Sequence, residues 1–179
     1  MSPREVEMIH VYPWKRVIGE SGILGVMSSY NDYDGLPVQS SFYWLTTRLR
    51  KEFGFKGYIV SDSDAVEYLF GKHNTAKDME EAVLQSVLAG LNVRCTFRSP
   101  DSYVLPLREL IRKGAISMNT IDDRVRDILR VKFLIGLFDQ PYQTNLKQAD
   151  KEVNCLEHQQ IALQTSREAL VLLKNENNL

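Results

Sequence analysis

The sequence is poor in the residues that build disulfide frameworks and metal clusters. Its 179 residues include two cysteines and three histidines. Cys95 and Cys155 do not have the spacing of metal ligands, and two cysteines alone do not establish a disulfide. The histidines are scattered along the chain. We therefore predict that the function needs neither a metal nor another cofactor.

The sequence also lacks an excess of charge of one sign and a long apolar run. Basic residues number 22 and acidic residues 23, with no basic block, which argues against nucleic acid as the main partner. No apolar stretch approaches the roughly 20 residues of a membrane-spanning helix, so we expect no membrane partner. The N-terminal residues lack the basic-then-apolar layout of a signal peptide, which leaves the localisation unknown.

What the sequence does contain is a short apolar strand that ends in an aspartate. Residues 57–64 read Gly-Tyr-Ile-Val-Ser-Asp-Ser-Asp, and such a run without polar alternation is typical of a strand buried on both faces of a parallel sheet. The carboxyl ends of parallel strands are where α/β proteins gather their chemistry. Asp62 is therefore the leading catalytic candidate, with a helix cap or a buried ion pair as the structural alternatives.

Helical and strand patterns alternate along most of the chain. Helices are expected over 3–20 (with a break at Pro13), 41–53, 75–90, 107–113 and 120–136, and strands over 23–30, 57–62 and 91–94. This β/α repetition predicts a parallel sheet. A complete β/α barrel typically needs about 250 residues, whereas three barrel-type strands are found here. We therefore predict an α/β fold that is part of a TIM-type barrel.

The rest of the chain departs from this repetition. Residues 139–153 are polar and irregular, which predicts a linker. A helix is expected from Asn154 onward, and residues 170–174 read as a strand that begins a new unit.

Other charged and aromatic residues lie near the predicted strand ends. Tyr30 ends the strand before the aspartate-bearing one, so its phenol is expected on the same face as that carboxylate. Asp64, with Glu67 three residues later, has the layout of a helix N-terminal cap, which we favour over catalysis for this pair. Arg94 and Arg98 flank the third strand end, where we expect ion pairs that support the core.

Taken together, these segments resemble the family 3 glycoside hydrolases, the β-glucosidase and β-xylosidase group. The matching segments run in the family's order through nearly the whole chain, at residues 25–31, 35–37, 49–62, 89–92, 122–132, 136–138 and 166–175.

The resemblance implies a retaining β-glycoside hydrolase that releases a terminal β-linked glucose or xylose. Its nucleophile maps onto Asp62, and Tyr30 and Ser61 map onto positions expected to bind substrate. The expected partner is an oligosaccharide or an aryl or alkyl β-glycoside. A retaining mechanism needs a second carboxyl about 5–5.5 Å from the nucleophile, and the resemblance places this acid/base beyond the end of the chain.

The resemblance also predicts a division into domains. Residues 1–138 would be the C-terminal part of the barrel, 139–153 a linker and 154–179 the start of an α/β sandwich domain. The family's early barrel strands have no counterpart, so we expect the chain alone to be weakly active or inactive, with self-association possible through exposed sheet edges. Asn92 stands where many members have aspartate, which leaves its role open.

Two other interpretations use the same residues. Asp62-Ser63-Asp64 fits the aspartate pair of a magnesium-dependent phosphohydrolase of the haloacid-dehalogenase type, in which Asp62 would take the phosphoryl group. The second is a non-catalytic fragment that only binds sugar or a partner chain.

Overall fold

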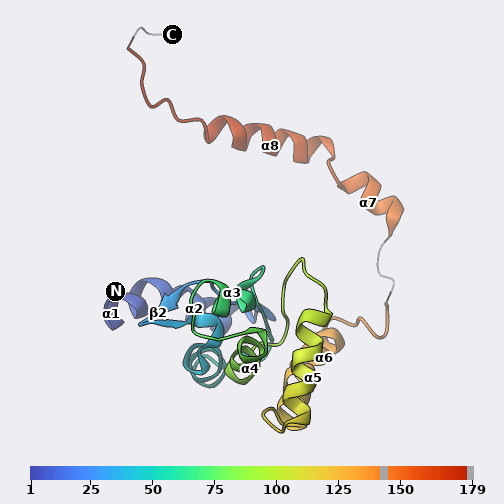
Figure 1. Cartoon of the computed structure of the whole chain (residues 1–179). Coiled ribbons are helices and arrows are strands. Elements are labelled where there is room, and N and C mark those ends of the chain that lie inside the picture. The colour runs from blue at the N-terminus through green and yellow to red at the C-terminus, as the bar shows by residue number, and fades with distance from the viewer. Residues whose placement is uncertain (142–144, 177–179) are drawn as a thin grey trace. The chain divides into compact units, whose positions relative to one another are not determined.

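The computed structural model describes residues 1–141 and 145–176, which fall into two compact units, Met1–Gly136 and Leu137–Leu179 (Figure 1). The first unit combines helices with short strands, so the chain has mixed α/β content. In chain order its elements are α1 Pro3–Glu5, η1 Val6–Val11, α2 Tyr12–Ser21, β1 Gly25–Met27, β2 Asp32–Tyr33, β3 Leu36–Pro37, η2 Val38–Ser40, η3 Tyr43–Glu52, β4 Tyr58–Val60, α3 Ala65–Gly71, α4 Met79–Ala89, α5 Asp101–Arg112 and α6 Met118–Leu134.

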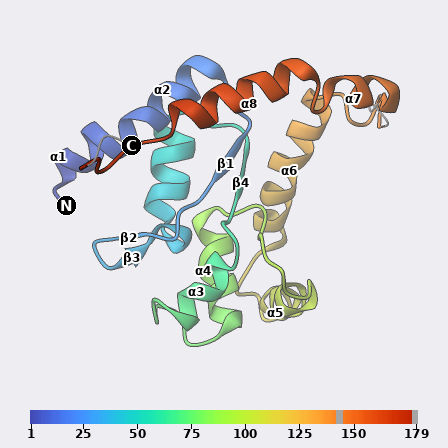
Figure 2. The same ribbon diagram turned by 90° about the horizontal axis from the view of Figure 1, so that it is seen from above.

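A short parallel sheet organises this first unit. Strand β1 pairs in parallel with β4, with Val26 opposite Ile59 (Figure 2). The next segment joins through a parallel bridge between Val60 and Val93. The π-helical segment η3 connects the two strands, and α3 and α4 lie between β4 and the bridge. The parallel β/α order expected from the sequence is therefore confirmed, although the third strand is reduced to a bridge.

The N-terminal helical stretch shows how the sequence sets local structure. Ser2 and Glu5 form a reciprocal capping box at its start. Pro13 lacks a backbone donor, and around it η1 changes into α2 at Tyr12. The expected break at Pro13 thus takes the form of a change in helix type. Gly22 ends the stretch with a left-handed backbone, φ 60°.

The core lies between the sheet and the helices that follow each strand. Ile59, Val66 and Leu69 are fully buried within one apolar cluster, and Leu110 and Ile116 belong to a second cluster against α4. A side chain at Gly57 would place its Cβ 2.1 Å from the Leu24 carbonyl oxygen. The residue before β4 lies against the backbone of Leu24, the residue before β1, and this close approach requires glycine.

Some predicted boundaries were wrong because the capping residue lies elsewhere. Helix α4 begins at Met79, since the side chain of Asp78 caps it, and not at Thr75. Helix α6 begins at Met118, capped by Ser117. Between β1 and η2 the chain forms the β2–β3 hairpin, whose turn is made by Asp34 (φ 56°) and Gly35 (φ 78°).

Helix α5 also begins before its predicted start. It runs from Asp101, so Pro106 lies inside the helix and not in its first turn.

The second unit differs from the prediction in two places. Part of the predicted linker forms helix α7, Leu146–Glu152, because Asn145 caps it; residues 142–144 lie outside the described residues. Helix α8, Leu156–Glu168, agrees with the expected helix after Asn154. The expected strand at 170–174 is irregular, with Leu173 92% exposed, since no described segment pairs with it. Residues 177–179 also lie outside the described residues.

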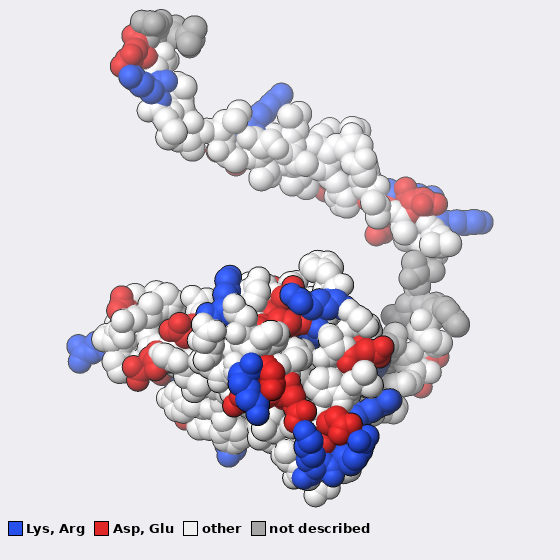
Figure 3. All heavy atoms as spheres, viewed as in Figure 1, with Lys and Arg blue, Asp and Glu red and all other residues white. Residues whose placement is uncertain are grey.

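Charged side chains of both signs are interspersed over the first unit, and several of them pair, such as Lys113 with Glu80 at 2.6 Å (Figure 3). Among the described residues, no helix is both long and apolar enough to cross a membrane.

Candidate active site

The ends of β1 and β4 bring together two of the residues singled out in the sequence. The Ser28 amide donates to the Val60 carbonyl at 2.8 Å, so the parallel pairing continues past β1 to the residues that follow both strands. Tyr30 then donates its hydroxyl to the Ser63 carbonyl at 2.6 Å. Burial, together with the nearby carboxylate of Asp62, raises the pKa of Tyr30 to about 12. Tyr30 therefore stays protonated and donating at neutral pH.

The carboxylate of Asp62 is half-buried and held by its own loop. Its Oδ1 accepts a hydrogen bond from the Ser63 amide at 2.6 Å. Its carbonyl accepts from the Ser61 hydroxyl at 2.8 Å and from the Ala65 amide at 3.2 Å. These bonds fix both the backbone and the side chain of Asp62 while leaving part of the carboxylate open to solvent.

Ser61 is 1% exposed, and its hydrogen-bonding groups are used within the fold. Its amide donates to the Val93 carbonyl, and its hydroxyl accepts from the Cys95 amide, both at 2.8 Å. In this geometry Ser61 supports the Asp62 loop. Its contact with substrate stays a prediction.

The favoured capping role of Asp64 and Glu67 was wrong. Asp64 occupies the N-cap position of α3 with a left-handed backbone, φ 57°, and its side chain makes no capping bond. It accepts instead from the Thr96 hydroxyl at 2.5 Å. Glu67 is paired with Arg94, and both side chains are 5% exposed. No cap forms because both carboxylates bind residues 94–96, which follow the bridge at Val93.

The expected ion pairing of the two arginines is confirmed for Arg94, which is bound to Glu67. Arg98 is 59% exposed, and its Nε lies 3.7 Å from a carboxylate oxygen of Asp64. Asp64 and Glu67 are therefore both engaged by residues of this chain.

Sequence reasoning did not single out two residues near the candidate site, Tyr68 and Thr96. The ring of Tyr68 lies 5.3 Å from that of Tyr30, centroid to centroid, and the ammonium of Lys72 lies 4.2 Å from the Tyr68 ring. Tyr68 lies one helical turn after Asp64, a spacing that places both on one helix face. This spacing is the feature of the sequence that could have identified Tyr68. No pattern in the sequence points to Thr96.

Asn92, whose role the sequence left open, supports the start of β4. Its side-chain oxygen accepts from the Ile59 amide at 2.8 Å and from Arg50 at 2.6 Å. Its side-chain nitrogen donates to the Arg124 carbonyl at 2.8 Å and to Asp127 at 3.1 Å. An aspartate could not make these last two bonds, so asparagine suits this position.

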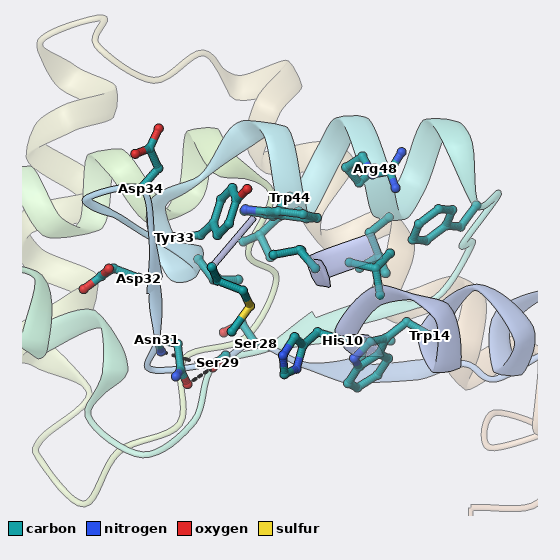
Figure 4. Close-up of a pocket in the computed structure, with 18 of the residues that line it drawn as sticks. His10, Trp14, Ser28, Ser29, Asn31, Asp32, Tyr33, Asp34, Trp44 and Arg48 are labelled. Atoms are coloured by element: carbon teal, nitrogen blue, oxygen red, sulfur yellow. Dashed lines mark hydrogen bonds between the residues drawn. The ribbon is translucent and has the colours of Figure 1, made fainter. Parts of the chain in front are cut away.

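A groove of about 790 Å³ lies along the free edge of β1 (Figure 4). Aromatic side chains from the N-terminal helical stretch and from η3 line it, including Trp14 and Trp44. Asp62 and Tyr30 do not line this groove. The groove and the candidate site at the strand ends are therefore separate features of the first unit.

The described ranges hold no group of three or more histidine, cysteine or acidic side chains placed to share a metal ion.

Comparisons with protein families, with individual proteins and with solved structures all point to one family. The N-terminal domain of glycosyl hydrolase family 3 matches residues 1–131. The chain is 36% identical to a putative β-xylosidase of Formosa agariphila, over 100% of this chain and 23% of that protein. It is 35% identical to a periplasmic β-glucosidase of Salmonella typhimurium, over 98% and 23%.

Solved structures agree. A β-glucosidase from Listeria innocua superposes with a TM-score of 0.81 at 31% identity, covering 100% of this chain and 24% of that one. A β-glucosidase from Erythrobacter marinus gives 0.80 at 32% identity, covering 94% and 22%. The chain thus spans about a quarter of the length of these relatives.

Proposed function

Because the chain belongs to glycosyl hydrolase family 3, we propose that it carries the nucleophile side of a retaining β-glycosidase site, with Asp62 as the nucleophile. The observation that carries this proposal is the half-buried Asp62 carboxylate at a parallel strand end, held beside Tyr30. The substrate class is a terminal β-linked glucose or xylose, since the relatives are β-glucosidases and β-xylosidases.

In this mechanism the Asp62 carboxylate attacks the anomeric carbon while the bond to the leaving oxygen breaks. The sugar becomes an ester of Asp62, and water then cleaves that ester and restores the carboxylate. Tyr30 keeps its proton at neutral pH and holds the Ser63 carbonyl, which keeps the loop in the attacking geometry. Ser61 supports the same loop through its hydrogen bonds to the backbone of Val93 and Cys95.

The acid/base of this reaction lies outside the site described above. A retaining enzyme needs a second carboxyl about 5–5.5 Å from the nucleophile to protonate the leaving oxygen. Asp64 is bound to Thr96, and Glu67 is paired with Arg94, so neither is available for this role. The chain alone is therefore weakly active or inactive towards glycosides whose leaving group needs a proton.

The fold that accompanies this function is a partial (β/α) barrel. In this proposal residues 1–138 belong to its C-terminal part, residues 139–153 are a connection that contains α7, and residues 154–179 belong to a second, sandwich domain. The parallel order of β1, β4 and the bridge at Val93 supports the barrel assignment. In the described residues β1 pairs only with β4, so its other edge is available for self-association. Sedimentation velocity tests this, with Met27→Lys as the variant that should stay monomeric.

Leaving-group dependence tests the proposed function. A fluorinated β-glucoside or β-xyloside carrying dinitrophenolate needs no proton to leave. We expect it to add one glycosyl group to the folded chain, measured by intact mass, while a methyl glycoside is not turned over. A folded sample that adds no glycosyl group with either sugar would favour a non-catalytic fragment. Full-strength turnover of an alkyl glycoside would refute the missing acid/base.

The magnesium-dependent phosphohydrolase is not favoured, because the family match covers residues 1–131 while the aspartate pair spans three positions. It would require Asp64 as the acid/base, and Asp64 is bound by Thr96. We expect no magnesium-dependent turnover of p-nitrophenyl phosphate.

A further inference from the structure

The loop that carries Asp62 is held by residues 93–96, here named the clamp segment. The Ser61 amide donates to the first carbonyl of this segment at 2.8 Å, and the Cys95 amide donates to the Ser61 hydroxyl at 2.8 Å. The Asp64 amide donates to the Cys95 carbonyl at 3.0 Å. These bonds lie on both sides of Asp62, so a shift of its backbone breaks at least one of them.

The clamp segment is itself held by the guanidinium of Arg94. Its Nε donates to Glu67 Oε1 at 3.0 Å, and its Nη2 donates to the Ser102 hydroxyl at 2.9 Å and also to Glu67 Oε1. The guanidinium carbon lies 5.6 Å from the centre of the Tyr103 ring. Arg94 is therefore fixed in direction by helix α3 on one side and helix α5 on the other.

Glu67 lies on α3, the helix that continues directly from the Asp62 loop. The ion pair thus joins the two ends of one structural unit: the clamp segment and the helix after the loop. Thr96 adds a second connection, because its hydroxyl donates to Asp64 Oδ1 at 2.5 Å. Arg94 and its neighbours are thus connected to residues on both sides of Asp62.

A contribution to folding stability is not sufficient to explain why Arg94 and Glu67 form a buried ion pair. Both side chains are 5% exposed, and Glu67 Oε2 is buried without a hydrogen-bond partner among the described residues. Removing two charges from water is costly, and well-packed apolar residues often replace such a pair without loss of stability. A positional role accounts for a buried pair that apolar residues could often replace without loss of stability.

We infer that Glu67 and Arg94 are positioning residues for the nucleophile: their ion pair fixes the clamp segment, and the clamp segment fixes the direction of the Asp62 carboxylate. This inference rests on the proposed function, since it assigns both residues to the same site.

The test compares Arg94→Lys and Glu67→Gln with the parent chain by hydrogen–deuterium exchange of the peptide over residues 58–66. Lysine keeps the charge but loses the forked donors, and glutamine keeps one acceptor but loses the charge. Loss of a buried charge-assisted hydrogen bond opens the loop, and we expect exchange there to rise by about tenfold.

A spectroscopic signal distinguishes a change in the direction of the Asp62 carboxylate from a general increase in the mobility of the loop. Burial and, after it, the Asp62 carboxylate raise the pKa of Tyr30 to about 12, so the pKa should fall in part when that carboxylate turns away. A titration followed by NMR of carbon-labelled tyrosine measures this, with Tyr30→Phe to assign the signal. The matched control is Arg98→Lys, at an exposed arginine that also approaches Asp64, for which we expect less than about a twofold change in exchange.

Unchanged exchange and an unchanged Tyr30 pKa in both variants would overturn the inference. Should Arg94→Lys fail to fold, as judged by circular dichroism, Ser102→Ala removes a single contact of Arg94 and decides in its place.

Failure of the proposed function gives a different result. If the parent chain takes no glycosyl label, the function fails, while the exchange data still report whether the pair holds the loop. If the parent is labelled and Arg94→Lys exchanges quickly but is labelled at the parent rate, the pair holds the loop without positioning the nucleophile, and the inference fails alone.

Discussion

The two ends of the parallel sheet use the same chemistry for different purposes. At the carboxyl end, Arg94 pairs with Glu67 and holds a loop whose Asp62 carboxylate remains partly open. At the amino end, Arg50 pairs with Asp127 at 2.9 Å, with side chains 14% and 13% exposed.

The groups that Arg50 contacts show the difference. It donates to the Gly57 carbonyl at 3.1 Å and to the side-chain oxygen of Asn92 at 2.6 Å, so it ties together the starts of neighbouring segments. Burial lowers the pKa of Arg50, which the charge of Asp127 opposes. The amino end therefore serves stability, which is what the proposed partial barrel would require of that face. Substitutions at one end should change chemistry, and substitutions at the other should change folding.

The largest expected effect is at the carboxyl end. Asp62→Asn removes the oxygen that we propose as the nucleophile, because an amide does not form the glycosyl ester. The rate of glycosyl labelling should fall by about a thousandfold or more, measured by intact mass against time.

The matched control for this variant is Asp32→Asn, an exposed aspartate of β2. It should be labelled at the parent rate. Equal labelling of Asp62→Asn and the parent would contradict the assignment of the nucleophile.

At the amino end, Arg50→Ala removes the closest cationic partner of the buried Asp127 carboxylate, which keeps Arg130 and the Asn92 amide, each at 3.1 Å. We expect a loss of about 3 kcal/mol in the free energy of unfolding, at the lower end of the cost of a broken buried pair. Urea denaturation measures this loss. The labelling rate of the molecules that remain folded should stay within about twofold of the parent, because the contacts of Asp62 are unchanged.

Arg112→Ala removes an exposed pair with Glu109 and is the control for Arg50→Ala. Its cost should be below about 1 kcal/mol. Similar costs for the two variants would show that the amino-end network does not stabilise the sheet.

Asn92→Asp sharpens the contrast, because it introduces the residue found in many family members. The new carboxylate would face Asp127 and lose the donor to the Arg124 carbonyl. We expect a loss of about 1–3 kcal/mol in unfolding free energy, again from urea denaturation. The exposed Asn119→Asp should change stability by less than about 0.5 kcal/mol. A stabilising Asn92→Asp would show that the amide is not matched to its neighbours.

The smallest effect is expected for Tyr30→Phe, which removes the bond to the Ser63 carbonyl and should slow labelling by about tenfold or less. The raised pKa also predicts a pH effect. Folded Tyr30 binds its proton more tightly than unfolded Tyr30. The stability it contributes is therefore complete below about pH 10 and is lost as pH rises towards about 12.

Denaturation at alkaline pH should show a smaller loss of stability for Tyr30→Phe than for the parent. Equal losses in the two chains would mean that folding does not raise the pKa of Tyr30.

Much of the fold was predictable from local pattern. The apolar run at 58–60 and the glycine at 57 specified β4, and the β/α order specified its parallel pairing with β1. Placement of Tyr30 beside Asp62 followed from the shared direction of those strands.

The errors have physical causes. Asp64 and Glu67 look like a cap along the sequence, but their carboxylates bind Thr96 and Arg94, 32 and 27 residues later, and Asp64 makes no capping bond. Such contacts leave no local signal. The strand expected at 170–174 has apolar residues but no neighbour among the described segments, and a strand pattern without a partner does not form a strand.

Peptide mapping of the labelled chain tests the central claim most directly. After reaction with the fluorinated dinitrophenyl glycoside, proteolysis and fragmentation locate the added sugar to a single residue. The account predicts an ester on Asp62 and nowhere else. A sugar found on Asp64, on Glu67 or on a side chain outside the strand-end loop would contradict it.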